Sequence, residues 1–218
     1  MIKVVSWFRR KPGMSFDDFD AYWRHEHPKV VLQLPGLRKY VQNHLLASPV
    51  DGGREPFADG VAETWWDDRS ALAALRGTGL LEELAADEAV FQDGRLDQLV
   101  TEEVVIVNGA IPVDGVKVIT WAHRRPDLSL EAAQRYWREE HPKVVNELPG
   151  VRRYVQSHHR PARTEHAVMG LPMVWFDDVD QLRANARSSE LAAVRADEPN
   201  FLQADNLPFV VVKEHHII

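Results

Sequence analysis

Residues 3–44 read KVVSWFRRKPGMSFDDFDAYWRHEHPKVVLQLPGLRKYVQNH, and residues 117–158 read KVITWAHRRPDLSLEAAQRYWREEHPKVVNELPGVRRYVQSH. The two stretches align at a constant offset of 114 without a gap, and 23 of the 42 positions are identical. Further along, WWDD at 65–68 matches WFDD at 175–178, and ADE at 86–88 matches ADE at 196–198, both at an offset of 110. The chain is therefore a tandem duplication.

The repeat sets the domain organisation. We expect one domain over residues 1–109 and a second over 115–218, with NGAIPVDG (108–115) as the connector, and the four-residue difference falls in the loop after residue 45. Two copies are too few for a solenoid, which needs at least ~3 repeats. Each copy has the size of a small domain that pairs with a twin. The duplication predicts a pseudo-dimer within one chain, which could itself form a homodimer.

Composition excludes several classes of protein. The chain has 218 residues, 26 Lys plus Arg against 33 Asp plus Glu, and a net charge of −7. The acidic balance argues against a nucleic-acid partner, and no apolar run is long enough for a membrane span. No secretory signal precedes the first charges, so we expect a cytoplasmic protein. The sequence contains no cysteine, which removes disulfides, thiolate nucleophiles and iron–sulfur clusters.

Each repeat contains the same predicted order of elements. In the first, strands are predicted at 2–9, 37–46, 60–67 and 100–107, with helices from Ser15 to the Pro28 break and at 69–77 and 79–90. The second follows at 116–123, 129–147, 151–160, 168–176, 179–198 and 208–215. The order β-α-β-β-α-β predicts an α+β fold of two ferredoxin-like repeats. Packing of their antiparallel sheets would give an eight-stranded α/β barrel with room for a ligand between the sheets.

A polar row on the second strand of each repeat is the first candidate site. Because side chains alternate along a strand, we expect Leu37, Val41 and Leu45 to face the helices and the polar row to face the other way, into the space between the sheets of the barrel. Buried polar groups need partners, because each orphan costs ~1–3 kcal/mol, so the row favours a pocket over a dry core. The alternative is a solvated sheet face. The row comprises Arg38, Tyr40, Gln42 and His44, repeated identically as Arg152, Tyr154, Gln156 and His158.

The second candidate is the histidine in YWRxEHPKVV, which occurs at 22–31 and 136–145. His27 and His141 lie where a proline breaks the helix, which could turn each imidazole toward the open face of the sheet. Histidine suits general acid–base chemistry near neutral pH. The alternative is a structural histidine that hydrogen-bonds a carbonyl freed by the proline.

Together these motifs resemble the EthD family of the dimeric α/β-barrel superfamily. The resemblance covers essentially the whole chain, twice. The family usually builds its barrel from two identical chains, so the fusion would let two sites diverge. The residues that carry it are Arg10, Pro12, Ser15, Tyr22, Trp23, His27, Pro28, Pro35, Gly36, Tyr40 and Gln42, with Arg124, Pro126, Ser129, Tyr136, Trp137, His141, Pro142, Pro149, Gly150, Tyr154 and Gln156 in the second copy.

The resemblance implies a cofactor-independent lyase, isomerase or cyclase that acts on a small aromatic, lactone or polyketide-type carbonyl substrate. It implies His27 with Tyr40 and His141 with Tyr154 as the acid–base residues. Substrate would contact the remaining polar residues of the row and a tryptophan on each first strand: Trp7, Arg38, Gln42, His44, Trp121, Arg152, Gln156 and His158. The alternatives are a binding or accessory protein without catalysis and a haem enzyme of the same superfamily.

Two other patterns are interpreted as structural. His25 and His27 lie two positions apart, so on a helix they point away from each other and do not form a metal pair. The sequence therefore predicts no metal site. The acidic residues at 82, 83, 87 and 88 are interpreted as a solvated helix face.

Overall fold

A computed structural model of the chain describes residues 1–46, 55–162, 166–203, 205 and 207–218. The loop expected to hold the extra four residues of the first repeat lies largely in 47–54, outside the described residues. The chain divides into two compact units. Unit 1 comprises Met1–His44, Ala58–Val100 and Glu214–Ile218, and unit 2 comprises Leu45–Phe57 and Thr101–Lys213.

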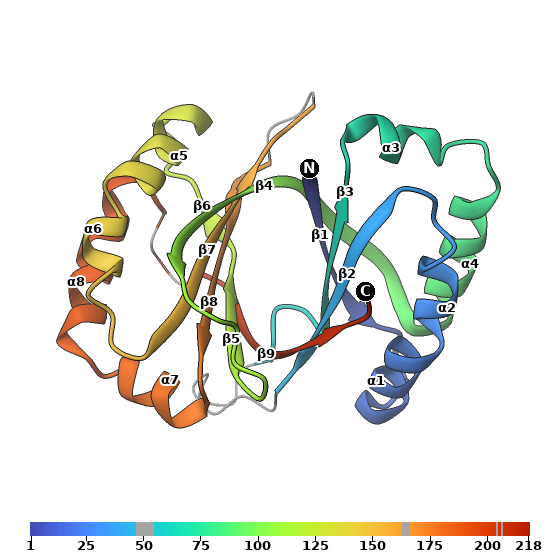
Figure 1. Ribbon diagram of the computed structural model, residues 1–218, viewed down its shortest axis with the longest axis horizontal. Coiled ribbons are helices and arrows are strands. Elements are labelled where there is room, and N and C mark those ends of the chain that lie inside the picture. Colours follow the sequence, from blue (N-terminus) through green and yellow to red (C-terminus); the bar gives the residue numbers. More distant parts are fainter. Residues whose placement is uncertain (47–54, 163–165, 204, 206) are drawn as a thin grey trace. The chain divides into compact units, whose positions relative to one another are not determined.

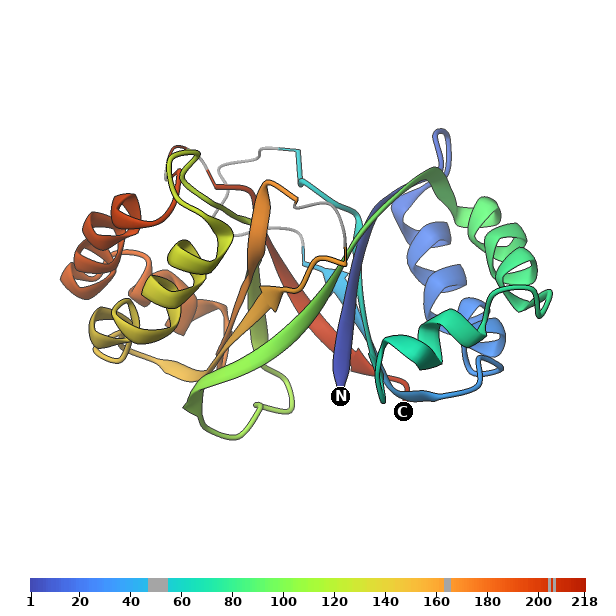
Figure 2. The same cartoon turned by 90° about the horizontal axis from the view of Figure 1, so that it is seen from above.

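Unit 1 holds the elements of the first repeat, with helices covering one face of the strands (Figures 1 and 2). Its strands are β1 (Ile2–Arg10), β2 (Leu37–Leu45), β3 (Gly60–Trp66) and the beginning of β4 (Gln92–Asn108). Its helices are α1 (Phe16–His25), α2 (His27–Val31), α3 (Arg69–Ala74) and α4 (Leu80–Phe91).

Unit 2 repeats this arrangement (Figures 1 and 2). It contains the end of β4, then β5 (Val116–Thr120), β6 (Ala122–His123), β7 (Val151–His159), β8 (Val168–Phe176) and most of β9 (Phe209–His216). Its helices are α5 (Leu130–Glu139), α6 (Pro142–Val145), α7 (Val179–Asn185), α8 (Ser189–Asp197) and the short 3₁₀ helix η1 (Glu198–Asn200).

The strand pairings confirm the predicted α+β class and its ferredoxin-like repeats. β3 pairs antiparallel with both β1 and β2, and β8 pairs antiparallel with both β5 and β7. Strands β4 and β9 each continue from one unit into the other. Within unit 2, β5 also pairs antiparallel with β9, and β7 pairs antiparallel with the end of β4.

Local sequence explains where the first helices begin and end. Ser15 is the N-cap of α1, and its hydroxyl accepts a hydrogen bond from the Asp18 amide at 3.1 Å, as the capping pattern predicts. Pro28 lacks an amide hydrogen, so α1 ends at His25 and α2 starts separately. Gly36 adopts a φ of 84° just before β2 begins, a conformation that favours glycine.

A β-bulge in β2 corrects the predicted orientation of the polar row. Leu37 pairs with Trp66 and Lys39 with Trp65, so Arg38 is an extra residue in the ladder. One inserted residue ends the strict alternation, and the residues after it change face. Leu37 and Tyr40 consequently share the helix-covered face. The register of β7 shifts in the same way between Val151 and Arg153, with the same effect on Tyr154, Gln156 and His158.

The contacts of Tyr40 place it on the helix side of the sheet. Its ring belongs to a buried cluster with Val31, Leu34 and Leu75, which come from the helical layer. Tyr154 packs in the same way against Val145 and Val194. The expectation that this row faces away from the helices was therefore wrong, and any site built from it lies between sheet and helices of its own repeat.

No helix among the described residues is both long and apolar enough to cross a membrane.

Candidate functional site

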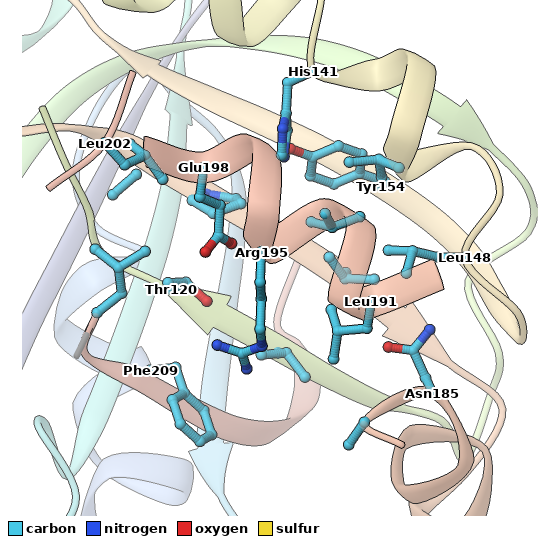
Figure 3. A pocket seen from close by; sticks show the side chains of 18 of the residues that line it. Thr120, His141, Leu148, Tyr154, Asn185, Leu191, Arg195, Glu198, Leu202 and Phe209 are labelled. Carbon is cyan, nitrogen blue, oxygen red and sulfur yellow. The ribbon is translucent and has the colours of Figure 1, made fainter. Parts of the chain in front are cut away.

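A cavity of about 460 Å³ lies between the sheet and the helices of unit 2 (Figure 3). Its volume is within the ~300–1,000 Å³ range of small-molecule sites. The walls are mostly apolar. Two of the residues predicted from the sequence, His141 and Tyr154, lie in these walls. The polar and charged side chains of the walls are Thr120, His141, Tyr154, Asn185, Arg195 and Glu198.

His141 is held by a carboxylate from the other end of the repeat. Its Nδ1 lies 2.7 Å from Oδ2 of Asp197, at the end of α8, and the imidazole is 5% exposed. The same carboxylate accepts a hydrogen bond from the Tyr136 hydroxyl at 2.7 Å and from the Asn200 amide at 2.9 Å. Because Asp197 engages Nδ1, Nε2 is the nitrogen that His141 can offer to a ligand in the cavity.

The charge states of the His141–Asp197 pair, called the dyad below, suit a general base. Burial lowers the pKa of His141 below its ordinary value of 6.5, although the neighbouring Asp197 acts in the opposite direction. Burial tends to raise the pKa of Asp197, but its hydrogen bonds with Tyr136 and His141 outweigh that effect and the pKa falls. At neutral pH the imidazole is thus neutral and the carboxylate charged. Nδ1 then carries the proton, and Nε2 presents a lone pair.

Tyr154 can donate a hydrogen bond into the cavity, and two neighbouring side chains that donate to its oxygen hold it in place. Its hydroxyl oxygen accepts from Nε1 of Trp137 at 2.8 Å and from Nε2 of Gln156 at 3.3 Å. Burial raises the pKa of this phenol, so it stays protonated. Among the described residues its proton has no protein acceptor, and Tyr154 lines the cavity with His141 (Figure 3). The phenol can therefore donate to an oxygen atom of a bound molecule.

Gln156 provides a hydrogen-bond donor for a backbone carbonyl near the helix break next to this tyrosine. Its Nε2 also donates to the backbone carbonyl of Trp137 at 2.7 Å, near the break between α5 and α6. Its Oε1 accepts from Nε2 of His158 at 2.8 Å. One amide thus links the freed helix carbonyl, the tyrosine and the second histidine of the row.

Glu198 adds an ionisable group to the cavity wall, from the residue after Asp197 (Figure 3). Burial raises its pKa above the ordinary glutamate value, Arg195 lowers it, and Asp197 raises it again. A carboxyl with a raised pKa keeps its proton to a higher pH and can act as an acid.

The first repeat has an equivalent dyad. His27 Nδ1 lies 2.5 Å from Oδ2 of Asp87, and the Tyr22 hydroxyl donates to the other oxygen at 2.8 Å. The ring centroids of His27 and Tyr40 are 6.4 Å apart, and Gln42 donates to the Tyr40 hydroxyl at 2.9 Å. The imidazole lies against the helical layer, not toward the open face of the sheet as the proline break suggested.

The two C-terminal histidines of the row differ in their partners. His44 Nδ1 lies 2.5 Å from Asp20, whereas Gln134 occupies the position corresponding to Asp20 in the second repeat and the Nδ1 of His158 is buried without a partner among the described residues. Burial lowers the pKa of His44 to about 4 and that of His158 to about 3. Both rings pack at a tilt against a tryptophan of the helical layer, with ring centroids 4.4 and 4.5 Å apart.

Four other predicted site residues lie elsewhere. Arg38 and Arg152 are exposed and pair with Asp67 and Asp177, so they are not in the cavity wall. Trp121 is buried between Thr120 and Ala122, which line the cavity, and by alternation its ring points to the opposite face of the sheet. Trp7 follows the same alternation, because Phe8 next to it packs on the helices. The structure does not bring these four to the dyads.

The aspartates of the dyads were missed from the sequence. Asp87 belongs to the acidic stretch interpreted as a solvated helix face, and that interpretation was wrong for this residue. The available signal was the repeat itself, since ADE occurs at the same place in both halves. Neighbouring Glu82 and Glu83 differ in this respect and are exposed.

Among the described residues, no three His, Asp or Glu side chains gather closely enough to hold a metal ion. His141 is the imidazole in the cavity wall, and it is the residue that would hold the iron of a haem, through Nε2. Its Nδ1 hydrogen bond to a carboxylate is an arrangement that orients metal-binding histidines.

The sequence matches the profile of the EthD domain over residues 11–95 and 125–205. No curated protein matches it.

Solved structures resemble the whole chain in fold. An anthrone oxidase-like protein is 12% identical with a TM-score of 0.70, and the match covers 99% of this chain and 92% of that chain. A putative monooxygenase from Fusobacterium nucleatum is 10% identical with a TM-score of 0.60, covering 98% and 91%. A variant chlorite dismutase from Candidatus Nitrospira defluvii is 13% identical with a TM-score of 0.59, covering 97% and 91%. At these identities the likeness concerns the fold alone.

Proposed function

The chain belongs to the EthD family, and from this membership and the geometry of the cavity we propose that it is a cofactor-independent enzyme that moves protons in a small carbonyl substrate. The reaction class is a lyase, isomerase or cyclase reaction on an aromatic, lactone or polyketide-type molecule. One observation carries the proposal: a neutral histidine, oriented by an anionic aspartate, lies in the wall of a largely apolar cavity.

His141 is the proposed base. Its Nε2 takes a proton from a carbon next to the substrate carbonyl, and the positive charge that forms is stabilised by Asp197 at 2.7 Å from Nδ1. A positioned base of this kind contributes ~10²–10⁴ in rate. The proton then returns to another atom of the substrate, or a leaving group departs.

Tyr154 is the proposed donor to the enolate oxygen. Its hydroxyl already accepts two hydrogen bonds, which fix its position and leave its proton for the ligand. A preorganised donor to a developing oxyanion contributes ~3–4 kcal/mol. Glu198, with its raised pKa, supplies a second acid in the same wall. Gln156 and His158 position Tyr154 and the helix break.

We place the reaction in the second repeat. His27 and Tyr40 form an equivalent arrangement, but there the Phe8 ring packs on Phe91 at 5.7 Å between centroids, and Phe91 lies 4.9 Å from the His27 ring. Arg38, Arg152, Trp7 and Trp121 have no direct part in this proposal.

Solvent exchange tests the proposal without knowledge of the natural substrate. In D₂O, exchange of the protons next to the carbonyl is followed by proton NMR for 2-tetralone, anthrone, a γ-lactone and a β-keto ester. The proposal expects exchange above the buffer rate for at least one compound. Binding of these compounds without any accelerated exchange would instead support a binding or accessory protein, and a Soret band in the purified protein would support the haem alternative.

A further inference from the structure

Phe8 and Ala122 occupy equivalent positions in the two repeats. They are 114 residues apart, the offset of the repeat. Phe8 pairs with Gly60 across β1 and β3, and Ala122 pairs with Gly170 across β6 and β8. The two glycines are themselves 110 residues apart, the second offset of the repeat. The register therefore matches on both strands.

In the first repeat the Phe8 ring fills the space between sheet and helices. It meets Trp23 edge-to-face, with centroids 5.2 Å apart and planes at 88°, and Phe91 at 5.7 Å and 77°. A Cβ on Gly60 would lie 2.8 Å from the ring, so the phenyl group packs directly on the glycine backbone. Such edge-to-face contacts are a favourable geometry for aromatic rings.

The second repeat keeps the surroundings of that ring but not the ring. Trp137 and Phe201 take the places of Trp23 and Phe91, and both line the cavity, as does Ala122. Phe201 also has the same position relative to the His141 imidazole as its counterpart has in the first repeat. The centroids of His141 and Phe201 are 4.8 Å apart, against 4.9 Å for the equivalent pair in the first repeat.

We infer that the cavity of the second repeat binds an aromatic ring in the place that the Phe8 side chain fills in the first, with Ala122 as the residue that admits it. The ring would contact Trp137 and Phe201 by its edge or face, so a substituent on it would lie near His141. This inference rests on the proposed function only for the chemistry that follows binding. It deepens that proposal by selecting the aromatic class from the three substrate classes.

Binding of 4-fluorophenol tests the inference, with cyclohexanol as the saturated control of similar size. Fluorine NMR and calorimetry are used to obtain affinity and stoichiometry. For the unmodified chain we expect one site, with 4-fluorophenol bound at least tenfold more tightly than cyclohexanol. Equal affinity for the two compounds would overturn the inference, because the site would then be apolar without preference for a planar ring.

Substitution of Ala122 tests where the ring of 4-fluorophenol binds. Ala122→Phe supplies the ring from the protein and should weaken 4-fluorophenol binding at least tenfold. The control Ala192→Phe adds the same group at an exposed position of α8 and should change the affinity less than twofold. Ala122→Leu is made in parallel, and circular dichroism verifies that each variant is folded. Undiminished binding in a folded Ala122 variant contradicts the inference.

The two proposals fail separately. Selective ring binding that Ala122→Phe abolishes, without exchange catalysis on any carbonyl compound, would leave the ring site standing and reject the enzyme proposal. Exchange catalysis, combined with ring binding that Ala122→Phe leaves unchanged, would support the enzyme proposal and reject the ring site.

Discussion

At the scale of single residues, the aspartate partner decides what His141 can do. A carboxylate on Nδ1 fixes the tautomer and stabilises the imidazolium that forms when Nε2 takes a proton. Burial keeps the ring neutral before the reaction, since it lowers the pKa of His141. The activity should therefore rise with pH through a value below 6.5, the ordinary pKa of histidine, as the base loses its proton.

Asp197→Asn should reduce kcat by a large part of the ~10²–10⁴ that a positioned base supplies, because the amide cannot stabilise the imidazolium. It should also move the rising limb of the pH profile to lower pH, since the charge that raises the pKa of His141 is gone. The matched variant is Asp87→Asn, which makes the same change in the first repeat. Equal losses in both variants, or an unchanged pH profile in Asp197→Asn, would contradict this assignment.

Glu88 provides a pH test of stability. Burial and then the charge of Asp87 raise its pKa to about 7 from 4.5. Between these values the folded chain binds more protons than the unfolded chain, so this residue lowers stability as pH rises from 4.5 to 7. Glu88→Gln mimics the protonated form, and it should be more stable than the parent at pH 8 by on the order of 1–2 kcal/mol after allowance for partial exposure. Urea unfolding at pH 4 and pH 8 measures the difference, and an equal difference at both values would refute the argument.

The sequence predicted the reactive residues of the site but not the face of the sheet on which their side chains lie. His141 and Tyr154 follow from the repeat and the motif, and both line the cavity. The alternation rule failed at Arg38, where nothing in the local sequence marks an inserted residue in the ladder. The partner of His141 was also missed, because Asp197 is 56 positions away along the chain and meets it only through packing of α8 against α6.

At the scale of elements, the break between α5 and α6 requires an outside donor. The amide of His141 donates to the carbonyl of Tyr136 at 3.2 Å, which leaves the carbonyl of Trp137 to Gln156 on β7, whose amide donates to it at 2.7 Å. The same group binds Tyr154 and His158, so it joins a strand to the helix break. The sequence predicted the break from its proline, and a histidine that hydrogen-bonds the freed carbonyl was one of two interpretations, whereas the structure shows Gln156 as a donor near the break.

Gln156→Leu should be destabilising because it leaves a buried carbonyl and a buried imidazole nitrogen without partners, at ~1–3 kcal/mol for each. Chemical denaturation should show a loss of about 2–6 kcal/mol. Gln33→Leu serves as the control, because its amide also donates to a helix carbonyl, that of Lys29, but at an exposed position. A similar small loss in both variants would show that the buried network contributes little.

At the scale of the whole molecule, duplication has produced two repeats with the same framework and different interiors. The number of repeats, the order of their elements and the fold class all follow from the alignment of the sequence with itself. The difference that matters for function was also visible there, as Phe8 against Ala122, but its importance depends on packing. Only the structure places the first side chain among aromatic rings and the second at a cavity.

The central claim is that the cavity of the second repeat is the active site. The most direct measurement is the rate of carbonyl-directed proton exchange in His141→Ala and in His27→Ala, the same substitution made in each repeat. We predict a loss of ~10²-fold or more in His141→Ala, with His27→Ala within about threefold of the parent. A loss confined to His27→Ala, or undiminished exchange in a chain that carries both substitutions, would contradict the account.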